Sequence, residues 1–296
     1  MKRYLFIGAV EYSAYCLKAL LEMNINIVDI MCPYKDVSKF NSDYFDLGEV
    51  AKEFGRRVYY FKSIKDEAIH IYKQKPDIIF VLGLSQIIPK SILEIPAIGC
   101  IGSHPALLPK NRGRHPIIWA IANGLKKSGV TLFWMDEGID SGDIWGQEEF
   151  EINIEDDATT VYEKIKEISL RILKKNIDEL EKGIVRRINQ DNFQANYWRK
   201  RSKSDGKIDW RMSSKRIYDL VRSLTKPYLG ADCILDSNEI KIWKCRILEP
   251  LSEFENIEPG KVIFSGEGRI TVKTGDGLIE IFEHTFDKLP NVGDYL

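Results

Sequence analysis

Apolar positions in the first half of the chain alternate between short runs typical of strands and longer stretches with a helical period. Residues 4–7 form an apolar run, residues 13–23 place apolar side chains on one helical face, and residues 25–31 form a second run. The same alternation predicts strands at 58–61, 78–82, 99–103 and 130–135, and helices at 45–54, 65–75, 116–123 and 160–180. This order predicts an α/β domain with a parallel sheet and helices on both of its faces.

The pattern changes after Gly183. Residues 198–207 (WRKRSKSDGK) form a charged, turn-rich connector, and we place the boundary between two domains there, at 1–203 and 204–296. Beyond one helix at 214–224, short apolar pieces are separated by glycine-rich turns, at 240–243, 261–263, 270–274 and 278–282. This spacing predicts a small β-barrel of the OB type as the second domain.

Composition narrows the class of protein without pointing to a partner. The chain has 296 residues, of which 44% are hydrophobic and 29% charged, with a net charge of −1, as is ordinary for a globular protein. Its five cysteines show no C-x-x-C spacing, so we expect reduced core thiols in a cytoplasmic protein and no zinc site. The apolar start is too short for a signal peptide, and no run reaches the roughly twenty apolar residues of a membrane span.

The turn after the first predicted strand argues against a nicotinamide enzyme. Residues 8–13 read GAVEYS and lack the G-x-G-x-x-G spacing that lets a backbone cradle a pyrophosphate. A Rossmann-like sheet is therefore expected, but with another ligand.

Two polar residues follow predicted strands directly. His104 leaves the strand at 99–103 into a proline-punctuated loop, and Asp140 lies in the acidic, glycine-bracketed segment 135–143. The carboxyl ends of such strands border the ligand crevice of α/β sheets, and a carboxylate that orients an imidazole raises its basicity. We predict a general-base pair here. A histidine that only bonds the backbone, or a solvated turn around Asp140, is the alternative for each residue alone.

Two further loops lie at the same predicted edge. Residues 107–113 read LLPKNRG, and Arg112 could hold a phosphate or carboxylate through two parallel N–H groups, or could instead stabilise its own loop. Residues 84–89 read LSQIIP and follow the strand at 78–82, so their backbone groups suit a flat heterocycle with several hydrogen bonds.

These segments resemble the formyltransferases that use 10-formyltetrahydrofolate, a family that includes methionyl-tRNA formyltransferase and the sugar N-formyltransferases. The family pattern of Asn-x-His, Ser-Leu-Leu-Pro-x-x-Arg-Gly, Gly-Val-Thr and Met-Asp-x-Gly-x-Asp-x-Gly is matched by residues 104–142 almost throughout. Residues 205–210, 217–224, 227–231 and 275–277 are similar to the carboxyl-terminal region of the family, so the resemblance covers nearly the whole chain.

The resemblance implies a mechanism and a donor site. An acceptor amine attacks the formyl carbon of 10-formyltetrahydrofolate while His104 assists its deprotonation and Asp140 orients His104. The pterin of the donor rests on a set of backbone groups and loop residues, which are Gln86, Ile87, Asp136, Gly138 and Ile139.

One position departs from the family pattern. Gly102 stands where the family has an asparagine that donates to the developing oxyanion. Loss of one such donor typically costs about a hundred- to a thousandfold in rate. Gln86, His104 itself or a water could replace it, whereas Ser103 should point to the opposite face of its strand.

The choice of acceptor depends on surface charge. A tRNA enzyme needs many phosphate contacts, and the resemblance implies a basic insertion after its second strand. Here residues 32–46 carry two lysines against three aspartates, and residues 112–121 are more similar to the sugar enzymes. The basic run 199–203 is the counter-observation, although such runs are usually solvated linkers. The sequence thus favours a UDP- or dTDP-linked amino sugar, destined for a bacterial surface glycan.

Other functions and partners follow from the same reasoning. A methionyl-tRNA formyltransferase, or a homologue that binds folate or nucleotide sugar with weak or no catalysis, stays an alternative. We expect a small-molecule acceptor, no nucleic acid, no membrane and no metal, and the resemblance implies a homodimer. Candidate acceptor contacts, each with an ordinary structural role as its alternative, are Arg112, Ser103, Trp134, Tyr197, Arg222 and Tyr228.

Overall fold

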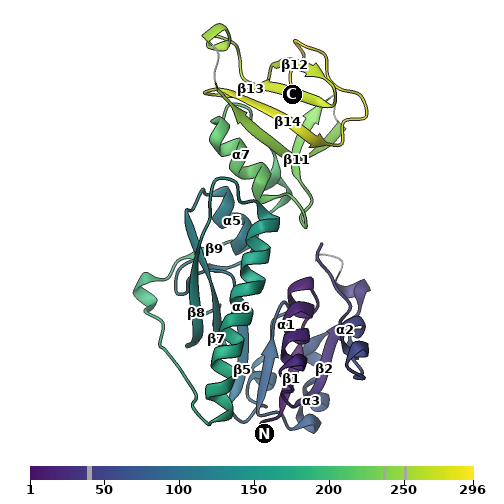
Figure 1. The fold of residues 1–296 in the computed structure, drawn as a ribbon, viewed down its shortest axis with the longest axis vertical. Coiled ribbons are helices and arrows are strands. Elements are labelled where there is room, and N and C mark those ends of the chain that lie inside the picture. Colours follow the sequence, from purple (N-terminus) through teal and green to yellow (C-terminus); the bar gives the residue numbers. More distant parts are fainter. Residues whose placement is uncertain (39–41, 236–237, 250–251) are drawn as a thin grey trace. The chain divides into compact units, whose positions relative to one another are not determined.

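The computed structural model describes residues 1–38, 42–235, 238–249 and 252–296, which form two compact units (Figure 1). The first unit contains Met1–Pro116, Ser128–Phe150 and Glu163–Trp198, and the second contains Ile117–Lys127, Glu151–Tyr162 and Arg199–Leu296. Two segments that come before residue 199 therefore belong with the C-terminal unit, which the sequence analysis did not predict. The boundary between residues 203 and 204 stays a prediction.

A seven-stranded sheet with the order β3-β2-β1-β4-β5-β7-β8 forms the centre of the first unit. Neighbouring strands from β3 to β5 pair in parallel, whereas β7 pairs with β5 in the antiparallel direction. The expectation of a wholly parallel sheet is thus wrong at one edge. The strands are β1 (Tyr4–Ile7), β2 (Ile27–Pro33), β3 (Tyr59–Phe61), β4 (Ile78–Val81), β5 (Gly99–His104), β7 (Lys127–Trp134) and β8 (Ile144–Glu151).

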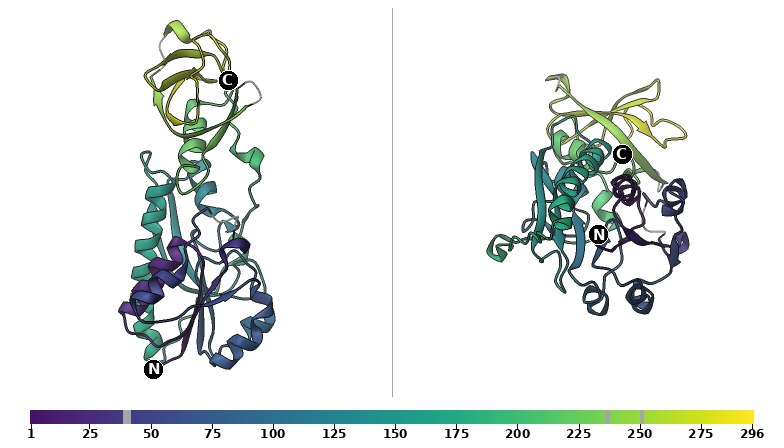
Figure 2. Two further views of the ribbon diagram at one scale, coloured as in Figure 1. Left: turned by 90° about the vertical axis from the view of Figure 1, so that its right-hand side faces the viewer. Right: turned by 60° about the horizontal axis from the view of Figure 1, so that its bottom comes forward.

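Helices cover both faces of this sheet (Figure 2). On one face α1 (Glu11–Glu22) lies beside α6 (Ala158–Glu181), and the Tyr12 hydroxyl donates to Ser169 Oγ over 3.0 Å. On the other, Ile71 and Ile92 pack with apolar side chains of β1 and β4, because alternate strand residues point to opposite faces. The other helices of this unit are α2 (Leu47–Glu53), α3 (Ala68–Gln74) and α4 (Lys90–Leu93), whereas α5 (Pro116–Ala122) belongs almost wholly to the second unit.

The turn between β1 and α1 is closed by its own serine. Ser13 Oγ accepts from the backbone N–H groups of Ala9 and Val10, each over 3.1 Å, and donates to the carbonyl of Leu82 over 2.5 Å. A Cβ at Gly8 would lie 2.5 Å from Ser13 Cβ, so glycine is required there. The N–H groups that would cradle a phosphate in a nicotinamide enzyme therefore bind a side chain of this protein.

The second unit is a five-stranded antiparallel sheet packed against α7 (Ser214–Ser223). Asp276 accepts from the backbone N–H of Ser214 over 2.7 Å, so the motif at residues 275–277 caps this helix. The pairings form one open series, and OB-type closure stays a prediction. The strands in spatial order are β10 (Ala231–Leu235), β11 (Asn238–Leu248), β14 (Leu278–His284), β13 (Arg269–Lys273) and β12 (Val262–Gly266).

The predicted elements agree with the observed ones to within a few residues, with some omissions. The strand β8 was missed because half of the residues in its sequence IWGQEEFE are polar and it contains no continuous apolar run. The pair β6 (Arg112–Gly113) and β9 (Tyr197–Trp198) and the strand β10 were also not predicted. The 3-10 helices are Lys35–Val37, Ile64–Asp66, Asn192–Gln194, Lys203–Gly206 and Ser252–Phe254.

The five cysteines lie buried and unlinked, as the sequence predicted. Burial raises the pKa of the thiols of Cys16, Cys100 and Cys233 to about 12, so these groups stay protonated at neutral pH. Within the described ranges, none of the helices combines the length and the apolar composition that crossing a bilayer requires.

Candidate active site

His104 ends β5, and its side chain is only 5% exposed. Its Nε2 lies 2.7 Å from the backbone carbonyl oxygen of Asn111, and its Nδ1 lies 3.5 Å from Asp140 Oδ2. The strand order places β5 between the parallel β4 and the antiparallel β7, so the imidazole lies at the carboxyl edge of the parallel strands. The structure thus brings His104 and Asp140 together.

Asp140 lies in the loop between β7 and β8, in a left-handed backbone conformation with φ of +51°. Its Oδ2 accepts from the backbone N–H of Gly113 over 2.8 Å, in addition to facing His104. The Asp140 side chain is 21% exposed. It is therefore the member of the pair that a ligand reaches more easily.

The acceptors around the imidazole determine where its hydrogen lies. A carbonyl oxygen only accepts, so Nε2 carries a hydrogen and Nδ1 faces the carboxylate of Asp140. The contact between Nδ1 and the carboxylate becomes favourable when a proton lies between them. His104 and Asp140 are therefore placed to hold a proton between them, and we call them the proton-holding pair.

The loop that supplies the carbonyl of Asn111 is fixed by a distant segment. Asn111 N–H donates to Asn196 Oδ1 over 2.8 Å, and Asn196 Nδ2 donates to Asn111 Oδ1 over 3.0 Å. The short strands β6 and β9 pair next to these residues. Gly113 has φ of +108°, and a Cβ there would lie 2.3 Å from the carbonyl oxygen of Trp198, so only glycine fits.

The structure corrects the interpretation of Arg112 as a residue that contacts the acceptor. The side chain is 2% exposed, and its guanidinium donates to Gln190 Oε1, Asn192 Oδ1 and the Tyr197 hydroxyl. These bonds fasten the segment 190–197 to the LLPKNRG loop. With its N–H groups used in this way, Arg112 has a structural role, and we leave it out of the acceptor site.

Gly102 lies beside Met135. A Cβ at Gly102 would lie 3.0 Å from Met135 Cγ and 3.3 Å from Phe133 Cζ. The thioether side chain of Met135 thus occupies space next to the position where the family pattern has an asparagine.

The other donors considered for that position have partners elsewhere. Ser103 bonds to Tyr12, on the face covered by α1, as the alternation along β5 predicted. The side-chain amide of Gln86 donates to the carbonyl of Lys62 over 3.1 Å and accepts from Ile64 N–H over 2.8 Å. Ser103 therefore leaves the predicted acceptor site. His104 and water stay the candidates for an oxyanion donor.

The loops after β4 and β7 present apolar side chains and backbone groups to solvent. Ile87 is 77% exposed and Ile139 is 63% exposed. Lys90 Nζ and Glu137 Oε1 lie 2.6 Å apart and join the two loops. In the part of the chain that the structure describes, the backbone of Ile87 makes no hydrogen bond.

Hydrogen bonds within the loop after β7 fix its shape. Asp136 accepts from Gly138 N–H over 3.0 Å and from the Ser141 hydroxyl over 2.8 Å. A Cβ at Gly138 would lie 2.0 Å from Ser141 Oγ, so glycine is required for the loop to close. A flat heterocycle with several polar edge atoms fits a surface where exposed apolar side chains lie beside unpaired backbone groups.

The aromatic and cationic residues that were predicted to contact the acceptor lie in different surroundings. Trp134 is buried and donates from Nε1 to the carbonyl of Arg186 over 2.8 Å, so its predicted stacking on a base is wrong. Tyr197 is 57% exposed and stays a candidate. Arg222 and Tyr228 belong to the second unit. There Arg222 is buried against Asp219 and Asn153, and Tyr228 packs on the hydrophobic core.

Sequence reasoning missed Asn111, Gln190 and Asn196. Asn111 contributes a backbone atom, and any residue type has a carbonyl. Gln190 and Asn196 come from a segment that no strand or helix pattern marks, and they meet the site only after the chain has folded.

Comparisons with known proteins identify the class. The formyl transferase family model matches residues 49–177, and the model of the formyl transferase C-terminal domain matches residues 200–291. The chain belongs to the formyl transferase family, and it is a formyltransferase.

Two curated relatives carry the same name. Methionyl-tRNA formyltransferase of Alkaliphilus oremlandii is 34% identical over 99% of this chain and 96% of that protein. Methionyl-tRNA formyltransferase of Halothermothrix orenii is 38% identical over 79% of this chain and 76% of its own length.

Solved structures with the same fold include enzymes of another kind. An N-formyltransferase from Helicobacter canadensis, crystallised with folinic acid and dTDP-3-aminofucose, has a TM-score of 0.72 at 23% identity and covers 96% of this chain and 100% of that one. A 4-N formyltransferase from Francisella tularensis has a TM-score of 0.66 at 25% identity, with 80% and 95% of the two chains covered.

Proposed function

We propose that this protein is an N-formyltransferase that moves a formyl group from 10-formyltetrahydrofolate to the amine of a nucleotide-linked amino sugar. The observation that carries the chemistry is the His104–Asp140 contact, in which Nδ1 lies 3.5 Å from Oδ2 and Nε2 is fixed by the carbonyl of Asn111. An amine that attacks a formyl carbon must lose a proton, and this pair is placed to take it.

The chemistry balances as an acyl transfer. The acceptor nitrogen forms a bond to the formyl carbon, and the bond between that carbon and N10 of the donor breaks. The amine releases its proton to the exposed carboxylate of Asp140, which passes it on to N10. His104 orients that carboxylate through Nδ1 and is itself fixed by the carbonyl of Asn111. The base in this proposal is the pair, whereas the sequence alone pointed to the imidazole.

The donor site is proposed at the two loops after β4 and β7. The exposed faces of Ile87 and Ile139 fit the flat pterin, and the backbone groups near Gln86 and Ile87 fit its polar edge. Asp136 and Gly138 shape the second loop. The Lys90–Glu137 ion pair holds the two loops at a fixed spacing.

We prefer a nucleotide sugar to tRNA as the acceptor because most cations of the basic cluster at residues 199–203 bond to groups of the protein itself. Arg199 makes two hydrogen bonds to the carboxylate of Asp205, and this guanidinium holds the pKa of Asp205 well below its usual range. Arg199 also lies over the ring of Trp119, 5.2 Å from its centroid. Arg199 is thus bonded to groups of its own unit, while its side chain is 63% exposed.

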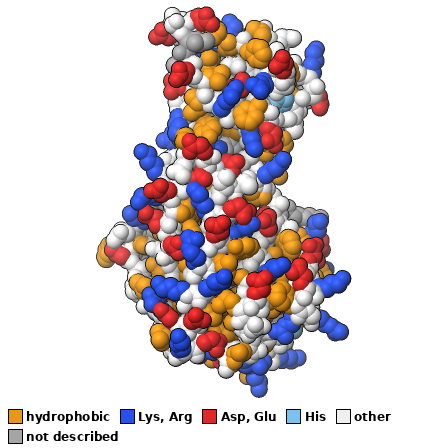
Figure 3. All heavy atoms as spheres, viewed as in Figure 1, with side chains coloured by type: hydrophobic (Ala, Val, Ile, Leu, Met, Phe, Trp, Pro, Cys, Tyr) orange, Lys and Arg blue, Asp and Glu red, His pale blue; other side chains and the backbone are white. Residues whose placement is uncertain are grey.

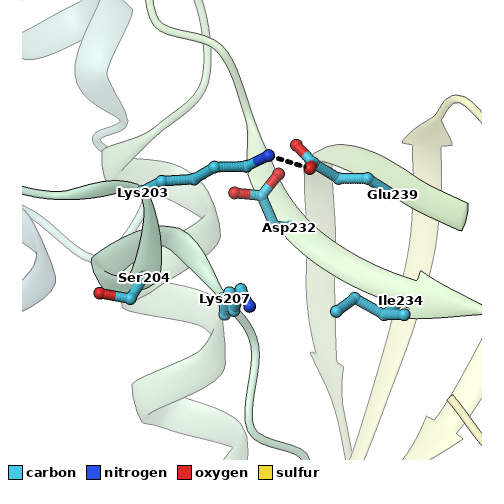
Figure 4. A pocket seen from close by; sticks show the side chains of 6 residues that line it. All are labelled: Lys203, Ser204, Lys207, Asp232, Ile234 and Glu239. Atoms are coloured by element: carbon cyan, nitrogen blue, oxygen red, sulfur yellow. Dashed lines mark ion pairs between the residues drawn. The ribbon is translucent and has the colours of Figure 1, made fainter. Parts of the chain in front are cut away.

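Arg201 and Lys203 also have partners within this unit, whereas Lys200 is exposed. Arg201 lies 5.1 Å from the Trp119 centroid, and burial lowers the pKa of its guanidinium. Lys203 pairs with Glu239 in a pocket that Asp232 also lines (Figure 4). Figure 3 shows acidic and basic side chains interspersed over the face in view. Of the residues 32–46 where a basic insertion was sought, 39–41 lie outside the described residues.

The second candidate is methionyl-tRNA as the acceptor. The curated relatives that share about a third of their residues with this chain carry that name. Both candidates use the same donor and the same His104–Asp140 pair, so only the acceptor distinguishes them.

The acceptor is tested by mixing the protein with 10-formyltetrahydrofolate and single acceptors, and following tetrahydrofolate release and product mass. The panel holds dTDP- and UDP-linked amino sugars, the same nucleotides with neutral sugars as controls, and charged methionyl-tRNA. We expect release only with an amino sugar. Release with methionyl-tRNA alone would overturn the sugar assignment, and no release with any acceptor would support a homologue that binds without turnover.

The missing oxyanion donor predicts an unusual gain of function. Gly102→Asn should raise kcat at least about tenfold, because one well-aimed donor is worth about a hundred- to a thousandfold and part of that is spent on displacing Met135. The rate of tetrahydrofolate release measures the effect.

Gly102→Ala is the matched control for this change. It places a Cβ against the same Met135 atoms and brings no amide. A gain with asparagine but not with alanine supports the missing donor. If asparagine is no faster than alanine, another group already supplies the donor, and a loss common to both variants measures the crowding against Met135.

A further inference from the structure

Gln190 connects two parts of the site that the chain brings together from far apart. Its side chain is 4% exposed. Its Nε2 donates to the backbone carbonyls of Asp140 and Gly142, over 2.9 and 2.7 Å. Its Oε1 accepts from Arg112, over 3.2 Å from Nε and 2.7 Å from Nη2. All four contacts have good hydrogen-bond lengths, and the amide is fully used.

The backbone at Asp140 needs such support. A left-handed conformation is unfavourable for a residue with a Cβ, by about 1 kcal/mol or more, and it persists only where the surroundings impose it. Gln190 holds the carbonyl of Asp140 itself and that of Gly142, on either side of the bend. A Cβ at Gly142 would lie 1.8 Å from the carbonyl oxygen of Trp134, so this part of the loop cannot relax toward β7.

Hydrogen bonds form a closed ring that passes through both the backbone and the carboxylate of Asp140. The guanidinium of Arg112 binds Gln190, and Gln190 binds the backbone of Asp140. The carboxylate of Asp140 then accepts from the N–H of Gly113, the neighbour of Arg112 in the chain. Both the backbone and the side chain of Asp140 are thereby held in place relative to β6. Asn111, the residue before β6, binds the other nitrogen of His104.

We propose that Gln190 is a positioning residue that sets the distance between the Asp140 carboxylate and His104 Nδ1. The proposal rests on the proposed function only in that the pair is the base for formyl transfer. Gln190 touches neither reacting group directly. It acts through the backbone of the loop that carries Asp140.

Gln190→Glu separates this role from a simple contribution to folding. The carboxylate keeps the contact with Arg112, now as a buried ion pair, so the segment 190–197 stays fastened. The two N–H donors are replaced by an oxygen that faces the carbonyls of Asp140 and Gly142. The loop must then move away from Gln190, and Asp140 moves with it.

The expected kinetic result is a fall in kcat of about 10- to 100-fold, the usual cost of removing a group that orients a functional ligand from behind. The KM of the acceptor should change less than about twofold, whereas the KM of the donor should rise by several-fold at most, because the loop that moves also carries Ile139. The pH–rate profile should shift, since the proton shared by His104 and Asp140 is held differently. Unchanged kcat and pH profile in a folded Gln190→Glu protein would overturn the proposal.

Two further variants complete the test. Gln194→Glu makes the same chemical change at an exposed position of the same segment, where the amide bonds only to Asp191, and kcat should stay within about twofold. Gln190→Met removes the donors without adding charge, and provides a second readout if Gln190→Glu does not fold. Loss of activity in both Gln190 variants with an intact pH profile would indicate a structural role alone.

A spectroscopic measurement separates this proposal from the question of the acceptor. The protein has four histidines, so ¹⁵N-histidine labelling gives few imidazole signals, and His104→Ala assigns the one of interest. We expect the Nδ1 signal of His104 to shift in both Gln190 variants and to stay in place in Gln194→Glu. A shift without turnover on any acceptor would keep the positioning role and reject the proposed function, whereas an unmoved signal rejects the positioning role whatever the acceptor.

Discussion

Replacement of His104 by alanine is expected to reduce kcat about a thousandfold, in the middle of the range for loss of a positioned acid–base group. The change removes the ring that faces Asp140 at 3.5 Å and leaves the carbonyl of Asn111 without its donor. The carboxylate keeps only the N–H of Gly113 and loses the group that holds the shared proton. The measurement is tetrahydrofolate release at saturating donor and acceptor.

The matched control for this change is His70→Ala. His70 also pairs with an aspartate, Asp29, over 2.6 Å, but it lies on α3, away from the proposed donor loops. Any general cost of deleting a histidine from a His–Asp pair should appear in both variants. A His104→Ala protein that folds, binds folate and keeps more than a tenth of the kcat would remove His104 from the mechanism.

Asp140→Asn is expected to lower kcat by about 100- to 1000-fold with little change in the KM of the donor. The amide oxygen can still accept from Gly113, and the amide nitrogen can donate to His104 Nδ1, so the shape of the site is preserved. What is lost is the shared proton and the negative charge that receives the amine proton. In the serine-protease triad, the same kind of replacement of the orienting aspartate costs about ten thousandfold.

Asp143→Asn tests the same chemical change in the same loop. Asp143 accepts from Asn189 Nδ2 over 3.3 Å and has no contact with His104. The rate of Asp143→Asn should stay within about threefold of the wild type. Equal losses in both variants would mean that the loop needs its overall negative charge and that Asp140 has no particular role.

The sequence predicted where the two chemical groups lie better than what surrounds them. We expected His104 and Asp140 to meet because both would follow strands that end at one edge of a parallel sheet. The two residues do meet, but β7 runs antiparallel to β5, so the reason was wrong: the loop after β7 starts opposite Ile101 and still brings Asp140 to His104. The surroundings could not be predicted, because Asn111 acts through its backbone and Gln190 reaches Asp140 from outside any patterned element.

Arg112 and Trp134 show the limits of residue type as a guide. An arginine in a polar loop suggests a ligand contact, yet Arg112 is buried because Gln190, Asn192 and Tyr197 together satisfy its N–H groups. Trp134 suggests a stacking platform, yet it ends β7 with its ring under the guanidinium of Arg187, 4.1 Å from the ring centroid. Both placements depend on the segment 186–197, whose fold no local pattern encodes.

The most direct test of the central claim, that His104 and Asp140 act as one unit, is the single-turnover rate of the double variant His104→Ala/Asp140→Asn with the best acceptor. Groups that act as a unit show strongly non-additive losses. We predict that the double variant is no more than about threefold slower than His104→Ala alone. Losses that multiply would show that the two residues act separately, and would contradict the account.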